Sequence, residues 1–295
     1  MLDLLLTIAC TTSIGVIIKL AETRVYERLT LLLFNYIVAT LVSFGLFLIS
    51  GGGHGGSGAI GQLSLSTFSL LTAPFAGFIF AFNFFLMILA IKKRGVALPV
   101  SLMRLSAIVP VAASLVFFDE APTWLQVLGM LGALAAAVMM SVSFRGGEMI
   151  RSEGGESRVW LAVTSLLLLF CFGLADLSMK LFERYGVMSE KPLFLSLLFA
   201  FAAISVGVPM IVKRIRIRWI DALWGVVLGV PNLFSSYFLV GALEDLPAYV
   251  VFPMVTAVTV MLIAIIARFA FGEAIGKVGV GGIILTLLSI LAINL

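Results

Sequence analysis

Charged side chains inside apolar segments are the residues of this chain that could do chemistry. Arg104 stands a few residues from the middle of the apolar run Val96–Phe118. An arginine at the centre of a membrane helix costs about 2.5–3.5 kcal/mol on insertion scales, so we expect a buried partner for it. Two interpretations stay open. Arg104 binds an anionic or zwitterionic substrate, or it pairs with carbonyls freed by Pro99 and Pro110 or with the Asp176 carboxylate.

Two lysines stand in similar motifs, VIIKLAE at Val16–Glu22 and SMKLFE at Ser178–Glu183. In each motif a glutamate follows the lysine by three residues, so the two charges share one face of a helix and can pair. One hypothesis is that Lys19 and Lys180 extend to the membrane interface. The other is that they face a central path and bind substrate. Asp176, one turn before Lys180, is a candidate proton carrier because it is an intramembrane carboxylate away from a helix end.

Further polar residues and two prolines are candidates for a substrate path and its moving parts. The polar residues either face a cavity or hold helices together, and the sequence leaves both open. Pro99 and Pro253 fall early in the fourth and ninth apolar runs. There each is expected to interrupt a backbone hydrogen bond and act as a hinge, or is simply tolerated. The candidate lining residues are Asn83, Asn232, Tyr237 and Tyr249.

Residues of the usual metal and redox sites are few. The single histidine, His54, lies in the stretch GGGHGGSG and has no neighbour with which to bind a metal. Cys10 and Cys171 lie in separate apolar runs, and we interpret them as small core residues. We therefore expect no metal and no cofactor. Glu120 and Glu273 stand at predicted helix ends, where we interpret them as turn or capping residues.

The elements that position these residues follow from composition. With 62% hydrophobic residues, 12% charged residues and a mean hydropathy of +1.20, the chain is unlike a water-soluble domain of 295 residues. About 20 apolar residues cross a membrane as a helix, and a closed barrel would show period-two alternation instead. The pattern predicts an all-α integral membrane protein with ten transmembrane helices. These are Leu2–Leu20, Leu29–Ser50, Phe68–Ile91, Val96–Phe118, Trp124–Ser143, Val159–Phe182, Pro192–Val212, Leu223–Leu243, Ala248–Phe269 and Val278–Leu295.

The basic residues predict the orientation of these helices. Of the 19 lysines and arginines, 15 fall in the odd-numbered connections and three in the even-numbered ones, and the termini carry none. Because lysine and arginine accumulate in cytoplasmic loops, the odd-numbered connections are predicted to be cytoplasmic. Both termini then lie outside. We expect the protein in the cytoplasmic, or inner, membrane.

An internal repeat divides the chain. A shift of 161 residues places Cys10 on Cys171 and Lys19 on Lys180, and a shift of 153 residues places Gly129 on Gly282. The repeats predict a first five-helix half at 1–145, a linker loop at 146–157 and a second half at 158–295. Because five is an odd number of spans, the second half is inverted relative to the first. Inverted halves of this kind are an architecture of secondary transporters.

The ends of the two predicted halves carry similar motifs. FFDEAPTWLQVLGMLGALAAAVMM at Phe117–Met140 and FGEAIGKVGVGGIILTLLSILAIN at Phe271–Asn294 both place an acidic residue before a glycine-bearing helix. In this they resemble the ending of the EamA-type repeat, and the whole chain resembles the ten-helix branch of the drug/metabolite transporter superfamily. The resemblance implies a transporter, in which lysines such as Lys19 and Lys180 recur. It departs from the family at Thr11–Gly15, where TTSIG replaces a usual tryptophan-glycine pair.

We therefore expect a secondary transporter that moves a small polar metabolite by alternating access. An anionic or zwitterionic substrate, such as an amino acid or organic acid, is favoured by Arg104. A channel-like or lipid-scrambling pore and an exporter of cationic or drug-like compounds stay open as alternatives. An enzyme would need clustered catalytic groups at one interface, so we expect no enzymatic activity. The expected partners are the substrate and the lipid bilayer, without nucleic acid, and the chain is expected to be a monomer or weak dimer.

Overall fold

Helices make up all the regular structure in the part of the chain that the structure describes. The computed structural model describes residues 1–21, 27–50, 66–94, 97–143, 158–270, 272 and 276–295. Three residues of interest, Glu22, His54 and Glu273, lie outside these ranges. The all-helical class expected from the sequence is confirmed for the described residues.

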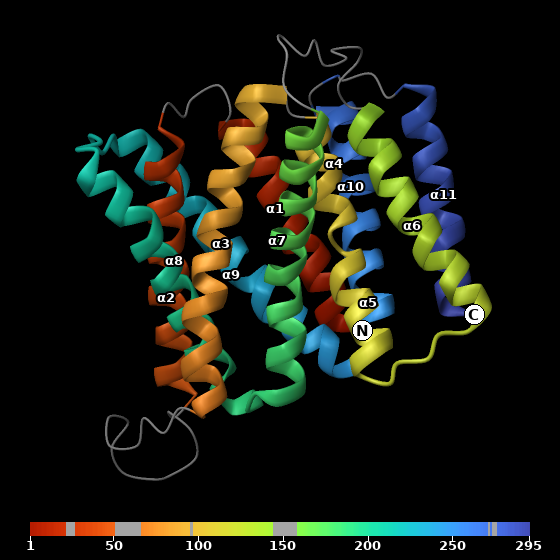
Figure 1. Ribbon diagram of the computed structural model, residues 1–295, viewed down its shortest axis with the longest axis horizontal. Helices are drawn as coiled ribbons and strands as arrows, with labels where there is room; N and C mark the ends of the chain where they lie inside the picture. The colour runs from red at the N-terminus through yellow and green to blue at the C-terminus, as the bar shows by residue number, and fades with distance from the viewer. Residues whose placement is uncertain (22–26, 51–65, 95–96, 144–157, 271, 273–275) are drawn as a thin grey trace. The chain divides into compact units, whose positions relative to one another are not determined.

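Ten helical segments of the described residues are long and apolar enough to cross a membrane, as the sequence predicts. The agreement supports a multi-pass membrane protein, because each segment approaches or exceeds the ~20 residues that a span needs. The helices, shown in Figure 1, are α1 (Leu2–Ala21), α2 (Arg28–Ile49), α3 (Thr67–Arg94), α4 (Ala97–Leu105), α5 (Ile108–Phe117), α6 (Trp124–Ser143), α7 (Arg158–Tyr185), the short 3₁₀ helix η1 (Met188–Glu190), α8 (Lys191–Val212), α9 (Trp219–Asp245), α10 (Ala248–Ala270) and α11 (Lys277–Asn294).

The fourth predicted span is broken into two helices. Helices α4 and α5 are separated by Ser106 and Ala107. Pro110 causes the break, because it has no N–H to donate to the carbonyl of Ser106, and Val109 N donates to that carbonyl instead at 2.9 Å. Pro99 lies in the first turn of α4, where a missing N–H costs no helical hydrogen bond. Pro253 lies inside α10. A hinge role for Pro99 and Pro253 stays a prediction.

The described residues form two compact units. Unit 1 consists of Met1–Phe82 and Ser178–Glu244, and unit 2 consists of Asn83–Leu177 and Asp245–Leu295. Each unit therefore takes helices from both predicted halves of the sequence. The predicted halves are defined by similarity within the sequence, whereas the two units are defined by contacts in space. The boundaries of the halves therefore stay a prediction.

Aromatic residues fill the core of unit 1. The rings of Phe182 and Phe194 stack with their centroids 4.1 Å apart, and Tyr36 stacks on Phe199 at 6.1 Å. Helix α2 packs along α8 (Figure 1), and the Ser43 hydroxyl donates to the carbonyl of Pro192 at 2.6 Å across that contact. Buried hydroxyl bonds to the main chain hold helices together without exposing polar groups to lipid.

Helix α3 approaches α8 closely at a glycine. A Cβ built on Gly77 would lie 2.9 Å from Phe201 Cβ and nearer still to the carbonyl oxygen of Leu198. The residue before α3 is also joined to η1, which leads into α8. The Glu190 carboxylate accepts hydrogen bonds from Ser66 N at 3.1 Å and from the Ser66 hydroxyl at 2.8 Å. The glycine allows the helices to touch and the carboxylate satisfies free amides at the helix start.

Helix α9 approaches α2 in the same way. A Cβ built on Gly229 would lie 2.7 Å from the carbonyl oxygen of Asn35 and 2.8 Å from Val38 Cβ. At the start of these helices, the buried Asp221 carboxylate accepts a hydrogen bond from Glu27 N at 3.1 Å. The contact between α9 and α2 thus repeats both features of the contact between α3 and α8.

Helices α6 and α11 pack side by side in unit 2 (Figure 1). A Cβ built on Gly129 of α6 would meet Ile293 N of α11 at 3.0 Å, and one built on Gly282 of α11 would meet the carbonyl oxygen of Ala136 in α6 at 3.1 Å. Ala136 and Met140 form a buried cluster with Val260 of α10. Small residues therefore set the separation of the helices in this unit as well.

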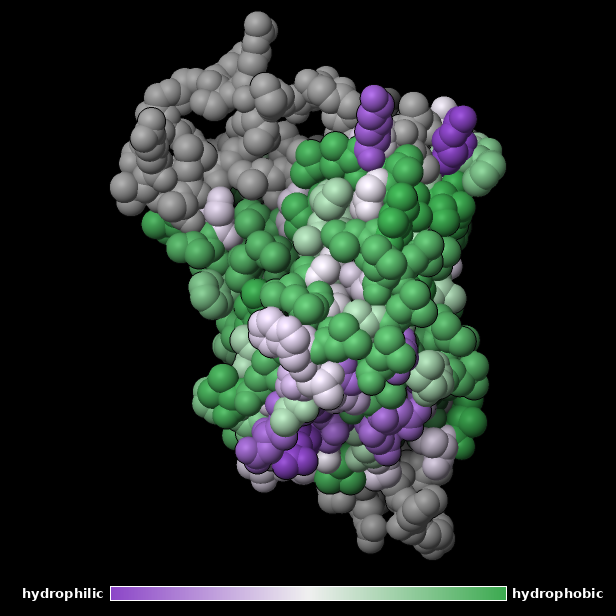
Figure 2. Space-filling model, turned by 90° about the vertical axis from the view of Figure 1, so that its right-hand side faces the viewer, coloured by the Kyte–Doolittle hydropathy of each residue, from purple (hydrophilic) through white to green (hydrophobic). Residues whose placement is uncertain are grey.

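Apolar side chains cover much of the surface, which is the arrangement that lipid contact requires. Exposed leucine, isoleucine, valine and phenylalanine side chains occur along the long helices other than α10, which exposes Phe269 near its end. Figure 2 shows a broad hydrophobic surface on one face, with a cluster of hydrophilic residues near the lower end of the view and two more at the upper end. The sides of the membrane on which the loops and termini lie stay a prediction.

Candidate functional site

A polar centre forms in unit 2 at the break between α4 and α5. Gly173 of α7 allows this helix to approach the break, because a Cβ built there would lie 3.0 Å from the Ser106 carbonyl oxygen and closer to Val109. Asp176, less than one turn further along α7, is close enough to Arg104 for the two charges to interact. The Asp176 charge therefore acts on Arg104 from the same unit, and the pairing of Arg104 with Asp176 stays a prediction.

Two buried polar atoms of this centre have no hydrogen-bond partner among the described residues. One is the Nε donor of Arg104, and the other is the Oδ1 acceptor of Asn83. Asn83 is 3% exposed, and its Nδ2 donates to the carbonyl of Cys171 on α7 at 3.1 Å. Leaving a buried donor or acceptor unpaired costs about 1–3 kcal/mol. An unpaired donor and an unpaired acceptor near the same stretch of α7 form the candidate functional site.

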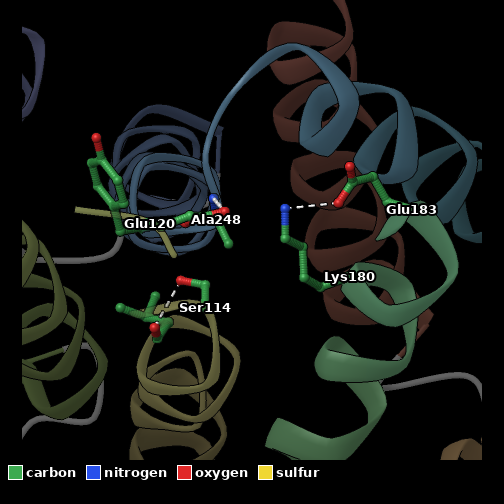
Figure 3. A network of polar contacts seen from close by, with 7 residues as sticks. Ser114, Glu120, Lys180, Glu183 and Ala248 are labelled. Carbon is green, nitrogen blue, oxygen red and sulfur yellow. Dashed lines mark hydrogen bonds and ion pairs between the residues drawn. The ribbon is translucent and has the colours of Figure 1, made fainter. Parts of the chain in front are cut away.

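Lys180 and Glu183 form an ion pair on α7 in unit 1. The Nζ atom of Lys180 lies 2.7 Å from Oε2 of Glu183, three residues further along the helix (Figure 3). Lys180 is only 5% exposed. Its ammonium group therefore pairs inside the unit instead of extending into water. Lys19 is half-buried, and its predicted partner Glu22 lies outside the described residues.

Two of the predicted lining residues of unit 1 make local contacts. The Nζ atom of Lys191, at the start of α8, lies 4.1 Å from the ring centroid of Tyr237 in a cation–π contact. The charges of Asp3 and Glu244 also act on Lys191. Asn232 is half-buried, and its carbonyl accepts a hydrogen bond from the neighbouring Ser236 hydroxyl at 3.4 Å. That Tyr237 and Asn232 line a substrate path stays a prediction.

Glu120 is a helix cap, as predicted. Its carboxylate accepts hydrogen bonds from Ala248 N at 3.1 Å and Tyr249 N at 3.4 Å, the first two amides of α10 (Figure 3). A carboxylate at this position satisfies free amides and interacts favourably with the helix dipole. Tyr249, predicted to line a path, is half-buried at this capped end.

The predicted site residues thus divide between the two units. Asn83, Arg104 and Asp176 come together around α7 in unit 2, while Lys19, Lys180, Asn232 and Tyr237 belong to unit 1 and Pro99, Tyr249 and Pro253 to unit 2. The sequence did not predict the contact of Lys191 with Tyr237. It also did not predict the 2.7 Å hydrogen bond between the Thr11 and Ser235 hydroxyls, because nothing in the sequence relates residues 224 positions apart. No group of three histidine, cysteine, aspartate or glutamate residues within the described ranges is arranged to hold a metal ion.

This chain is similar to one known sequence and to one solved structure. No model of a known protein family matches the chain. An uncharacterised protein of Haemophilus influenzae is 25% identical over 293 residues, which cover 98% of this chain and 96% of that protein. A crystal structure of another protein is similar with a TM-score of 0.74 and 16% sequence identity, over 99% of this chain and 98% of that one. The latter similarity shows a shared fold.

Proposed function

We propose that the protein is a secondary transporter of the drug/metabolite transporter type, which moves a small anionic or zwitterionic metabolite across the membrane by alternating access. The observation that carries the proposal is the repetition of the same helix contacts in the two halves of the chain. Repeated, inverted halves allow one half to adopt the conformation of the other, which is the basis of alternating access in such transporters.

The glycine contacts of unit 1 correspond residue by residue. Gly77 and Gly229 each stand ten residues after the first residue of their helices, α3 and α9. Gly77 faces the residues seven and ten positions after the start of α8, and Gly229 faces those seven and ten positions after the start of α2. Helices α3 and α2 are the third and second spans, while α9 and α8 are the eighth and seventh. The two contacts are therefore counterparts under exchange of the halves.

Unit 2 repeats this relation within one helix pair. Gly129 and Gly282, which the 153-residue shift aligns, face each other's helices. Gly129 meets Ser289 and Ile293, and the same shift relates these two residues to Ala136 and Met140, which Gly282 meets. Such reciprocal contacts are those of a two-fold relation, in which residue i contacts j and the counterpart of i contacts the counterpart of j. These contacts support two inverted five-helix halves.

Arg104 supports the choice of an anionic or zwitterionic substrate. Its Nε atom is a buried donor with no hydrogen-bond partner in the described part of the chain, and a carboxylate or phosphate oxygen would satisfy it. Asn83 offers an unpaired acceptor in the same unit, which favours a substrate that also carries an N–H or O–H group. Asp176 would hold the Arg104 charge while the substrate is absent, and its role as a proton carrier is part of the proposal.

Counterflow in proteoliposomes tests the proposed function. The purified protein is reconstituted, the vesicles are loaded in turn with unlabelled amino acids, organic acids, phosphate esters or cationic amines, and uptake of the labelled compound is measured. A transporter gives saturable uptake that internal substrate accelerates. A channel-like or scrambling pore instead gives linear flux without acceleration, and that result would refute the proposal. Acceleration by cationic amines alone would favour the drug exporter.

A binding measurement then assigns the substrate site. Thermal unfolding of the detergent-purified protein is followed with the same panel for wild type and Arg104→Ala. We expect stabilisation by an anionic or zwitterionic class in wild type and none in the variant. Arg104→Lys is the matched control, because it keeps the charge but loses the planar donor pair. Equal stabilisation of wild type and Arg104→Ala would return Arg104 to a structural role.

A further inference from the structure

The turn between α8 and α9 holds a cluster of cations at the end of two spans. Two hydrogen bonds end helix α8. The Met210 carbonyl accepts one from Ile215 N and the Ile211 carbonyl accepts one from Arg214 N, each at 3.0 Å. Arg214 has a φ of 50° at this closure, where glycine is the usual residue. Residues other than glycine, asparagine and aspartate rarely adopt this conformation. The chain therefore keeps an arginine here against its backbone preference.

Three of the cations of this turn are exposed and without counter-charges among the described residues. Lys213, Arg214 and Arg216 are exposed, and none has an ion-pair partner among the described residues. The carboxylate of Asp221, in the first turn of α9, is buried and accepts a hydrogen bond from Glu27 N. Three unpaired cations within four residues form a concentrated positive surface, which attracts anions strongly beside the low-dielectric interior of a membrane.

Large apolar side chains surround these cations. Val212 is 75% exposed, Ile217 54% and Trp219 86%, and the two flanking helices are both long and apolar enough to span a membrane. A tryptophan at the end of a span is the usual anchor at the headgroup level of the bilayer. The same turn thus presents apolar groups to the acyl boundary and cations to the layer of phosphates.

We propose that the α8–α9 turn is a binding site for anionic phospholipids, such as phosphatidylglycerol. Arg214 and Arg216 donate to the headgroup phosphate, which suits the planar guanidinium, and Lys213 adds a point charge. Trp219 and Ile217 lie against the lipid at the acyl boundary. The site is independent of the proposed transport, because it needs neither a substrate nor a conformational change.

Quenching of Trp219 fluorescence by brominated lipids tests this site in the full-length protein. The protein is reconstituted in phosphatidylcholine vesicles with increasing fractions of brominated phosphatidylglycerol, or of brominated phosphatidylcholine as the reference lipid. The signal of Trp219 is isolated by subtracting that of a Trp219→Phe variant. Each basic residue near an anionic surface is worth about fivefold in affinity, so three give a preference of up to about 100-fold for the anionic lipid.

Two triple variants separate the turn from general surface charge. Lys213→Gln/Arg214→Gln/Arg216→Gln is expected to lose the preference for phosphatidylglycerol. Arg184→Gln/Arg268→Gln/Lys277→Gln removes three exposed charges elsewhere and is expected to keep it. If the first variant is not monodisperse in gel filtration, Arg214→Gln and Arg216→Gln replace it, with about a fivefold loss expected in each.

Three results would overturn the proposal. Equal quenching by the two brominated lipids in wild type would mean that the turn does not select headgroup charge. An unchanged preference in the Gln variants of the turn would place the selectivity elsewhere. Loss of the preference on adding excess soluble glycerol phosphate, which has the same phosphate chemistry without acyl chains, would identify a site for soluble anions instead.

Discussion

Replacing Gly77 with alanine is expected to push α3 away from α8. The added Cβ would lie 2.9 Å from Phe201 Cβ and 3.0 Å from Ala202 N, and it would overlap the Leu198 carbonyl oxygen. Non-bonded carbon atoms contact at about 3.5–4.0 Å, so the helices must separate by several tenths of an ångström or more. Two of the three opposing atoms are backbone atoms of α8, which cannot rotate away as a side chain can.

The magnitude follows from two opposing effects. Overpacking a well-packed core costs about 1–3 kcal/mol. Alanine gains up to ~1 kcal/mol over glycine in a helix, which offsets part of that cost. We therefore expect Gly77→Ala to lower the free energy of unfolding by about 1–2 kcal/mol. Gly229→Ala, at the counterpart contact with α2, is expected to lower it by a similar amount, because its Cβ would also meet a backbone carbonyl.

Gly45→Ala is the matched control for both variants. Gly45 lies inside α2, and a Cβ built there meets nothing within 4 Å, so only the helix preference changes. We expect unchanged or slightly higher stability for this variant. Unfolding of the purified proteins is followed by circular dichroism during titration with sodium dodecyl sulfate in mixed micelles. If Gly77→Ala and Gly229→Ala unfold at the same detergent fraction as Gly45→Ala, the close packing inferred at the two glycines is wrong.

Three further predictions concern the ionised side chains. Glu120→Ala removes the cap of α10 and is expected to lower the free energy of unfolding by about 0.5–2 kcal/mol. Glu120→Gln keeps one acceptor oxygen and is expected to lower it less. Equal losses for the two variants in the same titration would contradict the capping role. Lys180→Met leaves Glu183 without its partner and is expected to cost up to ~3 kcal/mol, less than for a fully buried pair because the Glu183 side chain is 17% exposed. Adding Glu183→Gln should restore most of that stability, and failure to do so would show that the pair is not what Lys180 contributes. Asp176→Asn removes the carboxylate whose charge acts on Arg104 and is expected to lower the free energy of unfolding. The double variant Arg104→Met/Asp176→Asn is expected to recover part of that stability. Additive losses in the double variant would refute an interaction between the two charges.

The spans were predictable because their signal is local. A run of about 20 apolar residues is sufficient to identify a span, and the sequence contains every one of them without reference to the rest of the fold. The bounds differ where polar residues belong to a helix. Helix α9 runs from Trp219 to Asp245, while the apolar run covers Leu223–Leu243 only, because hydropathy does not register the buried Asp221 in the first turn.

The contacts between helices were less predictable because they join distant residues. Glu120 was identified as a cap, but the helix that it caps begins 128 residues later. Lys191 is one of the three basic residues counted in the even-numbered connections, although its ammonium group lies 4.1 Å from the ring centroid of Tyr237. The place of the break in the fourth span was not predicted from its prolines either. Pro99, which has a near counterpart in Pro253, begins a helix, and the break in the fourth span comes from Pro110.

The comparison of the two predicted halves separates the scaffold from the candidate site. The glycine contacts occur twice, as expected of residues that hold a repeated framework together. Arg104 and Pro110 occur once: the 153-residue shift places them on Ala257 and Ile263 of the unbroken helix α10. A framework residue has a reason to be repeated, whereas a substrate is asymmetric and meets the two halves differently. Under the proposed function, the break at Ser106–Ala107, with an unpaired arginine donor beside it, is therefore where the two predicted halves differ, and it is the first place to look for the proposed substrate.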